Sequence, residues 1–230
     1  MAQEEPRQFV KFTFYQLSTL WRRLPEEERQ RGKDEFLQAL ALAAEAALTR
    51  TYNLAGLRGD VDFMIWQVSE ELEVFQRVAT QFQNTGLGRY LRVPYSYLSQ
   101  TRRSIYISQH QHEGQEGSRT HIRPYGSKYL FVYPFVKTRA WYALSFERRQ
   151  AMMSEHFKIG HNYPSVRIHT TYSFGLDDQE FVLSFESDSP SDFLDLVMEL
   201  RETEASSYTL RDTPTFSCVA MSPAEILEAL

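Results

Sequence analysis

The stretch WYALSFERRQAMMSEH, from Trp141 to His156, repeats a pattern found earlier in the same chain as WRRLPEEERQRGKDEF, from Trp21 to Phe36. The two stretches share Trp, Leu, Glu, Arg, Gln and a second Glu at matching positions. They differ at the last position, where one copy has Phe36 and the other has His156. The repeat indicates an internal duplication. The exchange of a benzyl side chain for an imidazole indicates a position at which one copy departed from plain packing.

The duplication extends over both halves of the chain. Residues 51–57 (TYNLAGL) resemble residues 171–176 (TYSFGL), and residues 60–78 resemble residues 178–197. Alternating apolar residues predict strands, and apolar residues spaced by three and four predict helices. Each half then has the order strand, long helix, strand, strand, helix, strand. The predicted ranges are 8–16, 26–48, 50–57, 61–68, 70–84 and 94–99 in the first half, and 128–136, 146–162, 165–174, 179–186, 190–204 and 214–220 in the second.

This order of elements is that of a ferredoxin-like unit. We therefore predict an α+β fold of two tandem ferredoxin-like (βαββαβ) halves, which form a subunit of the dimeric α+β barrel type. Residues 1–110 would form the N-terminal half and residues 128–230 the C-terminal half, with Ser145 as the N-cap of its long helix. Residues 111–127 would connect the halves. They belong to a long polar stretch without periodicity, which is typical of a functional or mobile loop.

The bulk composition excludes several classes of protein. The chain has 230 residues and a formal net charge of −5, so no basic surface for nucleic acid is expected. The first residues are acidic and polar, unlike a signal peptide, and no apolar run approaches the roughly 20 residues that span a bilayer. Cys218 is the single cysteine, which excludes an internal disulfide and fits a reducing compartment. We expect a cytoplasmic protein without membrane insertion.

His156 projects from an apolar helix face. Its neighbours one turn away on the predicted helix are Met152, Met153 and Ile159. An imidazole in such surroundings is commonly a core residue that makes a hydrogen bond, but it can also be a metal ligand. The Phe at the matching position of the first half shows that packing alone does not require a histidine there.

The first strand of the second half carries further differences. Tyr133 and Lys137 stand where the first half has Thr13 and Leu17. Because side chains alternate along a strand, one face presents Tyr129, Phe131, Tyr133, Phe135 and Lys137. An aromatic wall with a cation at its end suggests a flat apolar ligand that carries negative charge at its edge. Such a ligand would bind only to the second half.

Each of these residues also has an ordinary structural interpretation. An aromatic strand face is usually core, and Lys137 at a strand end is usually solvated. His169, which replaces Thr49 of the first half, would be simply exposed, because it shares its strand face with Arg167, Thr171 and Ser173. His110 and His112 could bind a metal, but histidines in a polar loop are commonly exposed to solvent. The chain contains no Gly-rich phosphate loop, CxxC pair or HExxH motif.

Four motifs together resemble the chlorite dismutase-like haem protein superfamily, and within it the coproheme decarboxylases. They are YPFVK (133–137), WYALSFERRQAMMSEH (141–156), TYSFGLDDQEF (171–181) and LRETEAS (200–206). The resemblance covers essentially the whole chain, since the family consists of two ferredoxin-like halves. It implies that the C-terminal half binds haem or Fe-coproporphyrin III, that the N-terminal half binds no cofactor, and that the protein is a homo-oligomer, typically a pentamer.

The resemblance also implies roles for individual residues. His156 stands where the family places the iron ligand, and Tyr133 where the decarboxylases keep a redox-active tyrosine. Further residues would contact the ligand or its propionates: Lys137, Arg119, Ser206, Arg201, Phe135 and Trp141. His169 departs from the pattern, since chlorite dismutases carry an arginine there and many decarboxylases a glutamine. If His169 faces the ligand, its imidazole could accept a proton from peroxide.

The implied activity is the hydrogen peroxide-dependent oxidative decarboxylation of coproheme III to protohaem b, the last step of a haem biosynthesis pathway. Peroxide is the oxidant, and a radical on Tyr133 would take a hydrogen atom from a propionate. Two alternatives remain, of which the first has the same iron ligand. A chlorite dismutase would convert chlorite to chloride and oxygen and needs a strong cation near the iron. A non-enzymatic haem carrier or sensor would bind the tetrapyrrole without converting it.

Overall fold

The computed structural model describes residues 6–106 and 121–230, which form two compact units. The N-terminal unit consists of Met1–Leu98 together with Cys218–Leu230, and the C-terminal unit consists of Ser99–Ser217. The second unit therefore starts earlier than the predicted residue 128, and the end of the chain returns to the first unit. In the described part of the chain, no helix is long and apolar enough to cross a membrane.

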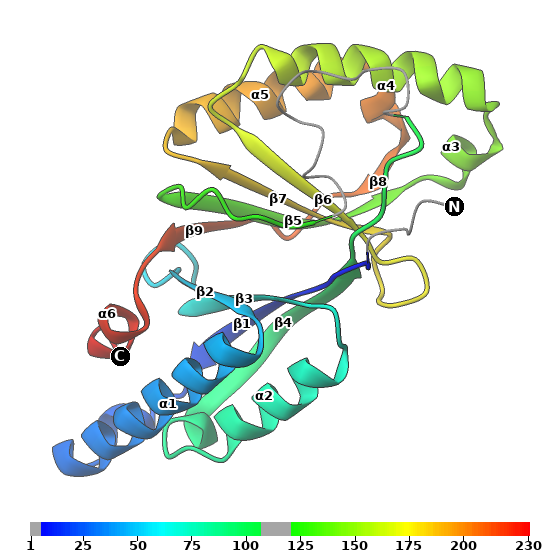
Figure 1. Ribbon diagram of the computed structural model, residues 1–230. Coiled ribbons are helices and arrows are strands. Elements are labelled where there is room, and N and C mark those ends of the chain that lie inside the picture. The colour runs from blue at the N-terminus through cyan, green and yellow to red at the C-terminus, as the bar shows by residue number, and fades with distance from the viewer. Residues whose placement is uncertain (1–5, 107–120) are drawn as a thin grey trace. The chain divides into compact units, whose positions relative to one another are not determined.

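The N-terminal unit has the predicted βαββαβ order. Its strands lie in the order β4-β1-β3-β2, with β3 antiparallel to both β1 and β2. Both long helices lie on one face of this sheet (Figure 1). The elements are β1 (Phe9–Leu17), η1 (Trp21–Arg23), α1 (Glu26–Ala46), β2 (Leu48–Asn53), β3 (Phe63–Ser69), α2 (Glu73–Gln83), η2 (Gly88–Tyr90) and β4 (Leu91–Gln100), with α6 (Pro223–Glu228) from the end of the chain.

Aromatic side chains fill the space between the helices and the sheet of this unit. Phe36 of α1 is fully buried. Its ring stacks on Phe82 of α2, with the centroids 4.9 Å apart, and meets Phe63 of β3 edge-on at 6.2 Å. These contacts bury aromatic surface on all three elements, which stabilises the unit through the hydrophobic effect.

The C-terminal unit repeats the same order. Its strands β6, β7 and β5 lie side by side, and β8 pairs with the other edge of β5. Its helices α4 and α5 lie on one face of the sheet (Figure 1). The elements are β5 (Tyr129–Lys137), α3 (Arg139–Ala143), α4 (Phe146–His161), β6 (Arg167–Tyr172), β7 (Phe181–Ser187), α5 (Pro190–Glu202), η3 (Glu204–Tyr208), β8 (Thr209–Arg211) and β9 (Phe216–Ala220).

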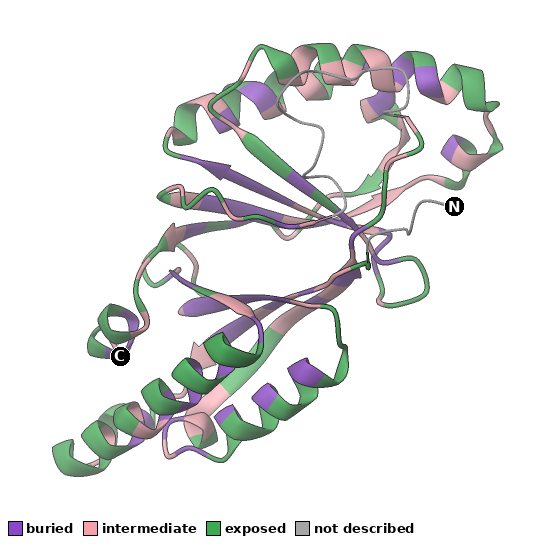
Figure 2. Ribbon diagram, in the orientation of Figure 1, coloured by how far each residue is buried: buried purple, intermediate pink, exposed green. Residues whose placement is uncertain are grey.

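Local signals fix where the helices of this unit begin. The Ser145 side chain accepts a hydrogen bond from the Arg148 backbone, so Ser145 is the predicted N-cap of α4. Ser189 caps α5 in the same way, and Pro190 follows at the first helical position. The central strands β3 and β7 are largely buried, while the outer sides of the helices are exposed (Figure 2). An α+β fold with two ferredoxin-like halves is thus confirmed.

Candidate functional site

A cavity of about 1110 Å³ lies within the C-terminal unit and is lined by residues from α4, α5, η3 and the sheet. Ligand pockets usually measure about 300 to 1,000 Å³, so this cavity can accept a large ligand. The matching space of the N-terminal unit is occupied by the stacked rings of Phe36 and Phe82. The two duplicated units therefore differ in the way that the exchange of Phe36 for His156 predicts.

The cross-strand register defines the sheet side of the cavity, which we call the floor. Residues that lie directly opposite each other on neighbouring strands point to the same face of a sheet. Rows across β5, β7 and β6 therefore share a face, and every member of three such rows lines the cavity. The rows are Phe131, Phe185 and Ile168; Tyr133, Leu183 and Thr170; and Phe135, Phe181 and Tyr172.

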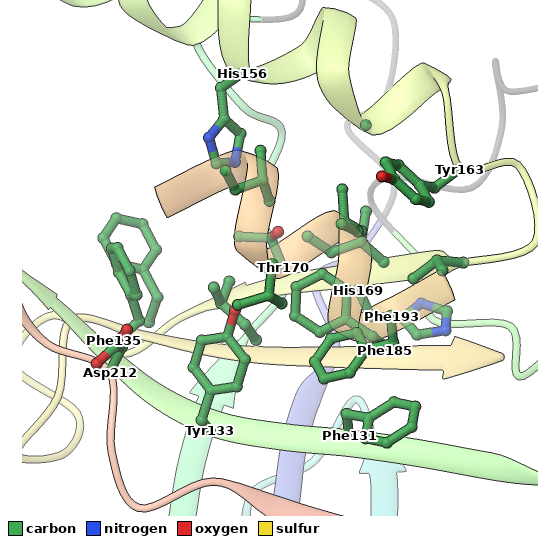
Figure 3. Close-up of a pocket in the computed structure, with 18 of the residues that line it drawn as sticks. Phe131, Tyr133, Phe135, His156, Tyr163, His169, Thr170, Phe185, Phe193 and Asp212 are labelled. Carbon is green, nitrogen blue, oxygen red and sulfur yellow. The ribbon is translucent and has the colours of Figure 1, made fainter. Parts of the chain in front are cut away.

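His156 enters the cavity from α4, on the side opposite the floor (Figure 3). Its Nδ1 atom is buried and has no hydrogen-bond partner among the described residues. Burial, and secondarily the nearby positive charge of Lys137, lower the pKa of His156 from 6.5 to about 4. The imidazole is therefore neutral near pH 7, which is the form that can donate a lone pair to a metal. A polar group left unpaired in such a place fits a position that a ligand completes.

Tyr133 lies in the central row of the floor. Its ring stacks on Phe185 with the centroids 5.7 Å apart. Burial, and secondarily the negative charge of Asp212, raise the pKa of the phenol well above its usual value of 10. The structure gives its hydroxyl no hydrogen-bond partner among the residues that it describes. Tyr133 is thus a neutral, unpaired phenol at the wall of an apolar cavity.

Lys137 places a cation at the end of β5. Its Nζ atom donates a 2.7 Å hydrogen bond to the carbonyl oxygen of Ala205 and lies 4.6 Å from the centroid of the Trp141 ring. Burial lowers the pKa of Lys137 to about 8, against the opposing effect of the Glu180 carboxylate. The same carboxylate accepts a hydrogen bond from the Lys137 backbone at 2.8 Å, which fixes the end of the strand. The ammonium group remains largely charged at pH 7 and can pair with an anion.

Other predicted ligand contacts also border the cavity. Phe135, Trp141, Arg201 and Ser206 all line it, so the structure brings them together with His156. Arg201 donates a 2.5 Å hydrogen bond to Asp212, another lining residue, which sequence analysis did not identify. Arg119, His110 and His112 lie outside the described residues. In the described part of the chain, no group of three or more His, Cys, Asp or Glu side chains could hold a metal ion.

The predicted exposure of His169 is wrong, and its surroundings do not support a role beside the ligand. His169 borders the cavity, but it is 8% exposed and lies opposite Ser184, on the face of the sheet away from Leu183 and Phe185. Its Nε2 atom lies 3.0 Å from the carboxylate of Glu186, which is fully buried. Figure 3 also shows its imidazole well apart from that of His156. Strand alternation instead directs the neighbours of His169, Ile168 and Thr170, into the cavity.

The segment before β5 explains why a histidine is buried there. The Glu186 carboxylate accepts hydrogen bonds from the backbone of Tyr125 at 2.7 Å and of Gly126 at 3.3 Å. The Tyr125 ring stacks on the His169 imidazole, with the centroids 5.7 Å apart. His169 and Glu186 therefore attach this segment to the sheet. Glu186 gave no signal in the sequence, because its partners are backbone groups and a residue on another strand.

The fold and the cavity define a class of protein with two ferredoxin-like units, of which the second carries a large apolar cavity lined by a histidine whose Nδ1 atom has no partner among the described residues. The chain belongs to the chlorite dismutase family, whose model matches residues 29–221. A coproheme decarboxylase from Mycolicibacterium smegmatis is 34% identical over 185 residues, which cover 78% of this chain and 75% of that protein. A second coproheme decarboxylase, from Staphylococcus saprophyticus, is 29% identical over 81% of this chain and 80% of its own length.

Solved structures of chlorite dismutase share the fold of this chain. A mutant of chlorite dismutase from Candidatus Nitrospira defluvii superposes with a TM-score of 0.89, at 26% identity, over 98% of this chain and 96% of that chain. The structure of chlorite dismutase from the same organism in complex with imidazole has a TM-score of 0.86 and 27% identity over 96% of this chain and 94% of its own. The fold is therefore shared between relatives that are named for two different reactions.

Proposed function

We propose that the protein catalyses the hydrogen peroxide-dependent oxidative decarboxylation of coproheme III to protohaem b. The observation that carries this proposal is the convergence of the Tyr133 phenol, the Lys137 ammonium and the His156 imidazole on one cavity. The names of the two curated relatives support the same reaction. Coproheme is a flat aromatic ring with acidic side chains at its edge, which matches an aromatic floor with cations at the border.

The residues that line the cavity fit an iron tetrapyrrole. His156 would hold the iron, because its imidazole is neutral and its Nδ1 atom has no partner among the described residues. Phe135 and Trp141 would contact the ring. Lys137, Arg201 and Ser206 would bind propionates through charge-assisted and neutral hydrogen bonds. Arg119 would add a further propionate contact.

The substrate makes particular demands on the protein. The propionate carbon that must lose hydrogen has no acidity, so a general base alone cannot start the reaction. When bound, the iron ring supplies oxidising chemistry with peroxide, and the protein supplies position and charge. Tyr133 would give up one electron together with its phenolic proton and become a phenoxyl radical. The radical would then take a hydrogen atom from the propionate, which restores the phenol, and carbon dioxide would leave as the vinyl group forms and a second electron passes to the oxidant generated from peroxide.

The state of Tyr133 suits this role. An unpaired phenol with a raised pKa keeps its proton, so oxidation would remove the electron and the proton together. No hydrogen bond to another described residue has to be broken first. The neighbouring Lys137 would fix the carboxylate of the reacting side chain, since both residues come from β5 and line the cavity.

Degradation of chlorite is the second candidate, because solved structures of chlorite dismutases match over nearly the whole chain. That reaction needs a strong cation beside the iron. None of the side chains of the floor that face His156 carries a positive charge. In the row of Tyr133, for example, the other two side chains are Leu183 and Thr170. Oxygen release sustained over many turnovers after addition of chlorite would nevertheless establish it.

The decisive experiment mixes the purified protein with ferric coproporphyrin III and hydrogen peroxide and follows the tetrapyrrole by mass spectrometry. Two successive losses of about 46 mass units, each a carbon dioxide plus two hydrogens, would support the proposal. A protein that binds coproheme tightly but returns it unchanged with peroxide would instead be a carrier or sensor.

A further inference from the structure

Thr170 lies on the floor of the cavity, and the proposed reaction gives it no role. It lies opposite Leu183 on β7, and Leu183 lies opposite Tyr133 on β5, so the three side chains form one row. Neighbouring strands are about 4.8 Å apart, which puts the backbones of Tyr133 and Thr170 roughly 10 Å apart. Figure 3 shows both residues on the sheet side of the cavity, with His156 approaching from the helix above.

The hydroxyl of Thr170 is available to a ligand. Thr170 is exposed, although helices cover this face of the sheet, because the cavity opens above it. No other described residue makes a hydrogen bond with its side chain. Hydroxyl groups of threonine in strands commonly bond to a neighbouring carbonyl, as Thr171 does on the reverse face with the Val182 carbonyl at 3.0 Å.

Thr170 is also distinct from the other polar groups of the floor. The hydroxyl of Tyr172 already has the side chain of Ser104 as a hydrogen-bond partner. Tyr133 stands at the other end of the row from Thr170, beside Lys137. Ile168, which precedes Thr170 on the same face of β6, is apolar and 52% exposed. Thr170 therefore contributes the polar group of β6 that has no partner within the described chain.

We infer that the Thr170 hydroxyl donates a hydrogen bond to the small ligand on the face of the bound tetrapyrrole that is turned away from His156. This inference rests on the proposed function and adds to it the group that receives peroxide or a small anion. A threonine hydroxyl is not a base near neutral pH, so its contribution is to orient and polarise the ligand rather than to remove its proton. Thr170 thus faces the cavity, whereas His169 lies on the reverse face of the sheet.

Fluoride is a suitable probe, because it is small, does not react with the oxidising system and accepts hydrogen bonds. Protein loaded with ferric coproheme is titrated with fluoride, and the dissociation constant is read from the absorption spectrum. Thr170→Val preserves shape and removes the donor, so fluoride should bind about 5- to 10-fold more weakly. Thr170→Ser keeps the donor and should remain within about twofold of the wild type.

Thr171→Val is the matched control, since it makes the same chemical change on the same strand but on the opposite face. Its fluoride dissociation constant should equal that of the wild type. Equal fluoride binding by wild type and Thr170→Val would overturn the inference for Thr170, while decarboxylation of coproheme by the wild type would still stand. A wild-type protein that takes up no ferric coproheme would overturn both the inference and the proposed function.

Discussion

Phe36 and His156 occupy matching positions of two duplicated helices, but only Phe36 is fully buried and completely packed. Phe36 stacks on Phe82, whereas His156 keeps a buried Nδ1 atom without a partner among the described residues. An unpaired buried polar atom destabilises a folded protein, so the C-terminal unit carries an energetic cost that the N-terminal unit avoids. A site that binds a ligand explains such a cost, because the ligand supplies the missing interactions.

Replacing His156 by Phe should therefore stabilise the ligand-free protein at acidic pH. The pKa of His156 is about 4 in the folded protein and near 6.5 in the unfolded chain, so unfolding takes up a proton between these values. The wild type then loses stability as the pH falls from about 6.5 towards 4. At pH 5 this effect amounts to about 2 kcal/mol, which His156→Phe removes. Urea unfolding of both proteins at pH 5 and pH 8 measures it.

The gain from His156→Phe should be larger at pH 5 than at pH 8, and an equal gain at both values would contradict the lowered pKa. The same variant should lose the resonance Raman signature of a histidine-bound iron after addition of ferric coproheme. His161→Phe, at the end of the same helix, is a control that should retain this signature.

Replacing Tyr133 by Phe should abolish decarboxylation while binding is retained. The ring stacks on Phe185 and the hydroxyl has no partner among the described residues, so the variant loses no internal hydrogen bond. We expect the coproheme dissociation constant to stay within about threefold and turnover with peroxide to fall by at least about 100-fold. Absorption titration measures the first and mass spectrometry the second. Normal turnover of Tyr133→Phe would remove this residue from the mechanism.

Coproheme binding should weaken as the pH rises through the pKa of Lys137. This pKa is lowered to about 8, so the ammonium is charged at pH 7 and largely neutral at pH 9.5. Loss of one charge-assisted hydrogen bond should weaken binding roughly 10-fold over this interval. Lys137→Arg should keep its charge and give a nearly constant affinity, as measured by fluorescence quenching on titration with coproheme.

Lys158→Met provides the control for net charge, since Lys158 is exposed on the same helix as His156 and does not line the cavity. It should show the same pH dependence as the wild type. If Lys137→Met also followed the wild-type curve, the titrating group would have to be another one.

The duplicated pattern predicts the two units because it repeats whole elements, and repeated periodicity is a strong signal. The predicted strand 128–136 is Tyr129–Lys137 in the structure, and the predicted helix 146–162 is Phe146–His161. The short elements were missed, among them α3 (Arg139–Ala143) and β8 (Thr209–Arg211). Three to five residues contain too few positions for a period to be recognised.

The sequence predicts the parts of the candidate site where a residue differs from its counterpart in the other half. It does not predict the parts that depend on contacts between distant segments of the folded chain. The contrast of His156 with Phe36 draws attention, from the sequence alone, to a residue that lines the cavity. The orientation of β6 does not follow from the sequence, because Ile168 is the only aliphatic side chain among residues 168–171 and a single apolar residue does not define an alternating pattern. Only the register with β7 shows which pair faces the cavity. The hydrogen bond from Lys137 to the Ala205 carbonyl also leaves no trace in the sequence, since any residue offers that acceptor.

His169 should therefore contribute to stability and not to the reaction with peroxide. Its imidazole, together with two backbone groups, satisfies the fully buried Glu186 carboxylate, so His169→Ala leaves part of this charge unpaired. We expect a loss of about 1–3 kcal/mol in the free energy of unfolding. The rate of the peroxide reaction of coproheme-loaded protein should stay within about twofold of the wild type, because the side chain lies on the reverse face of the sheet. Stopped-flow absorption and urea unfolding measure the two quantities.

Glu186→Gln, which keeps the shape but removes the charge, should likewise reduce stability and spare the rate. If His169→Ala left the stability unchanged but strongly reduced the rate, His169 would have to act on the ligand side of the sheet.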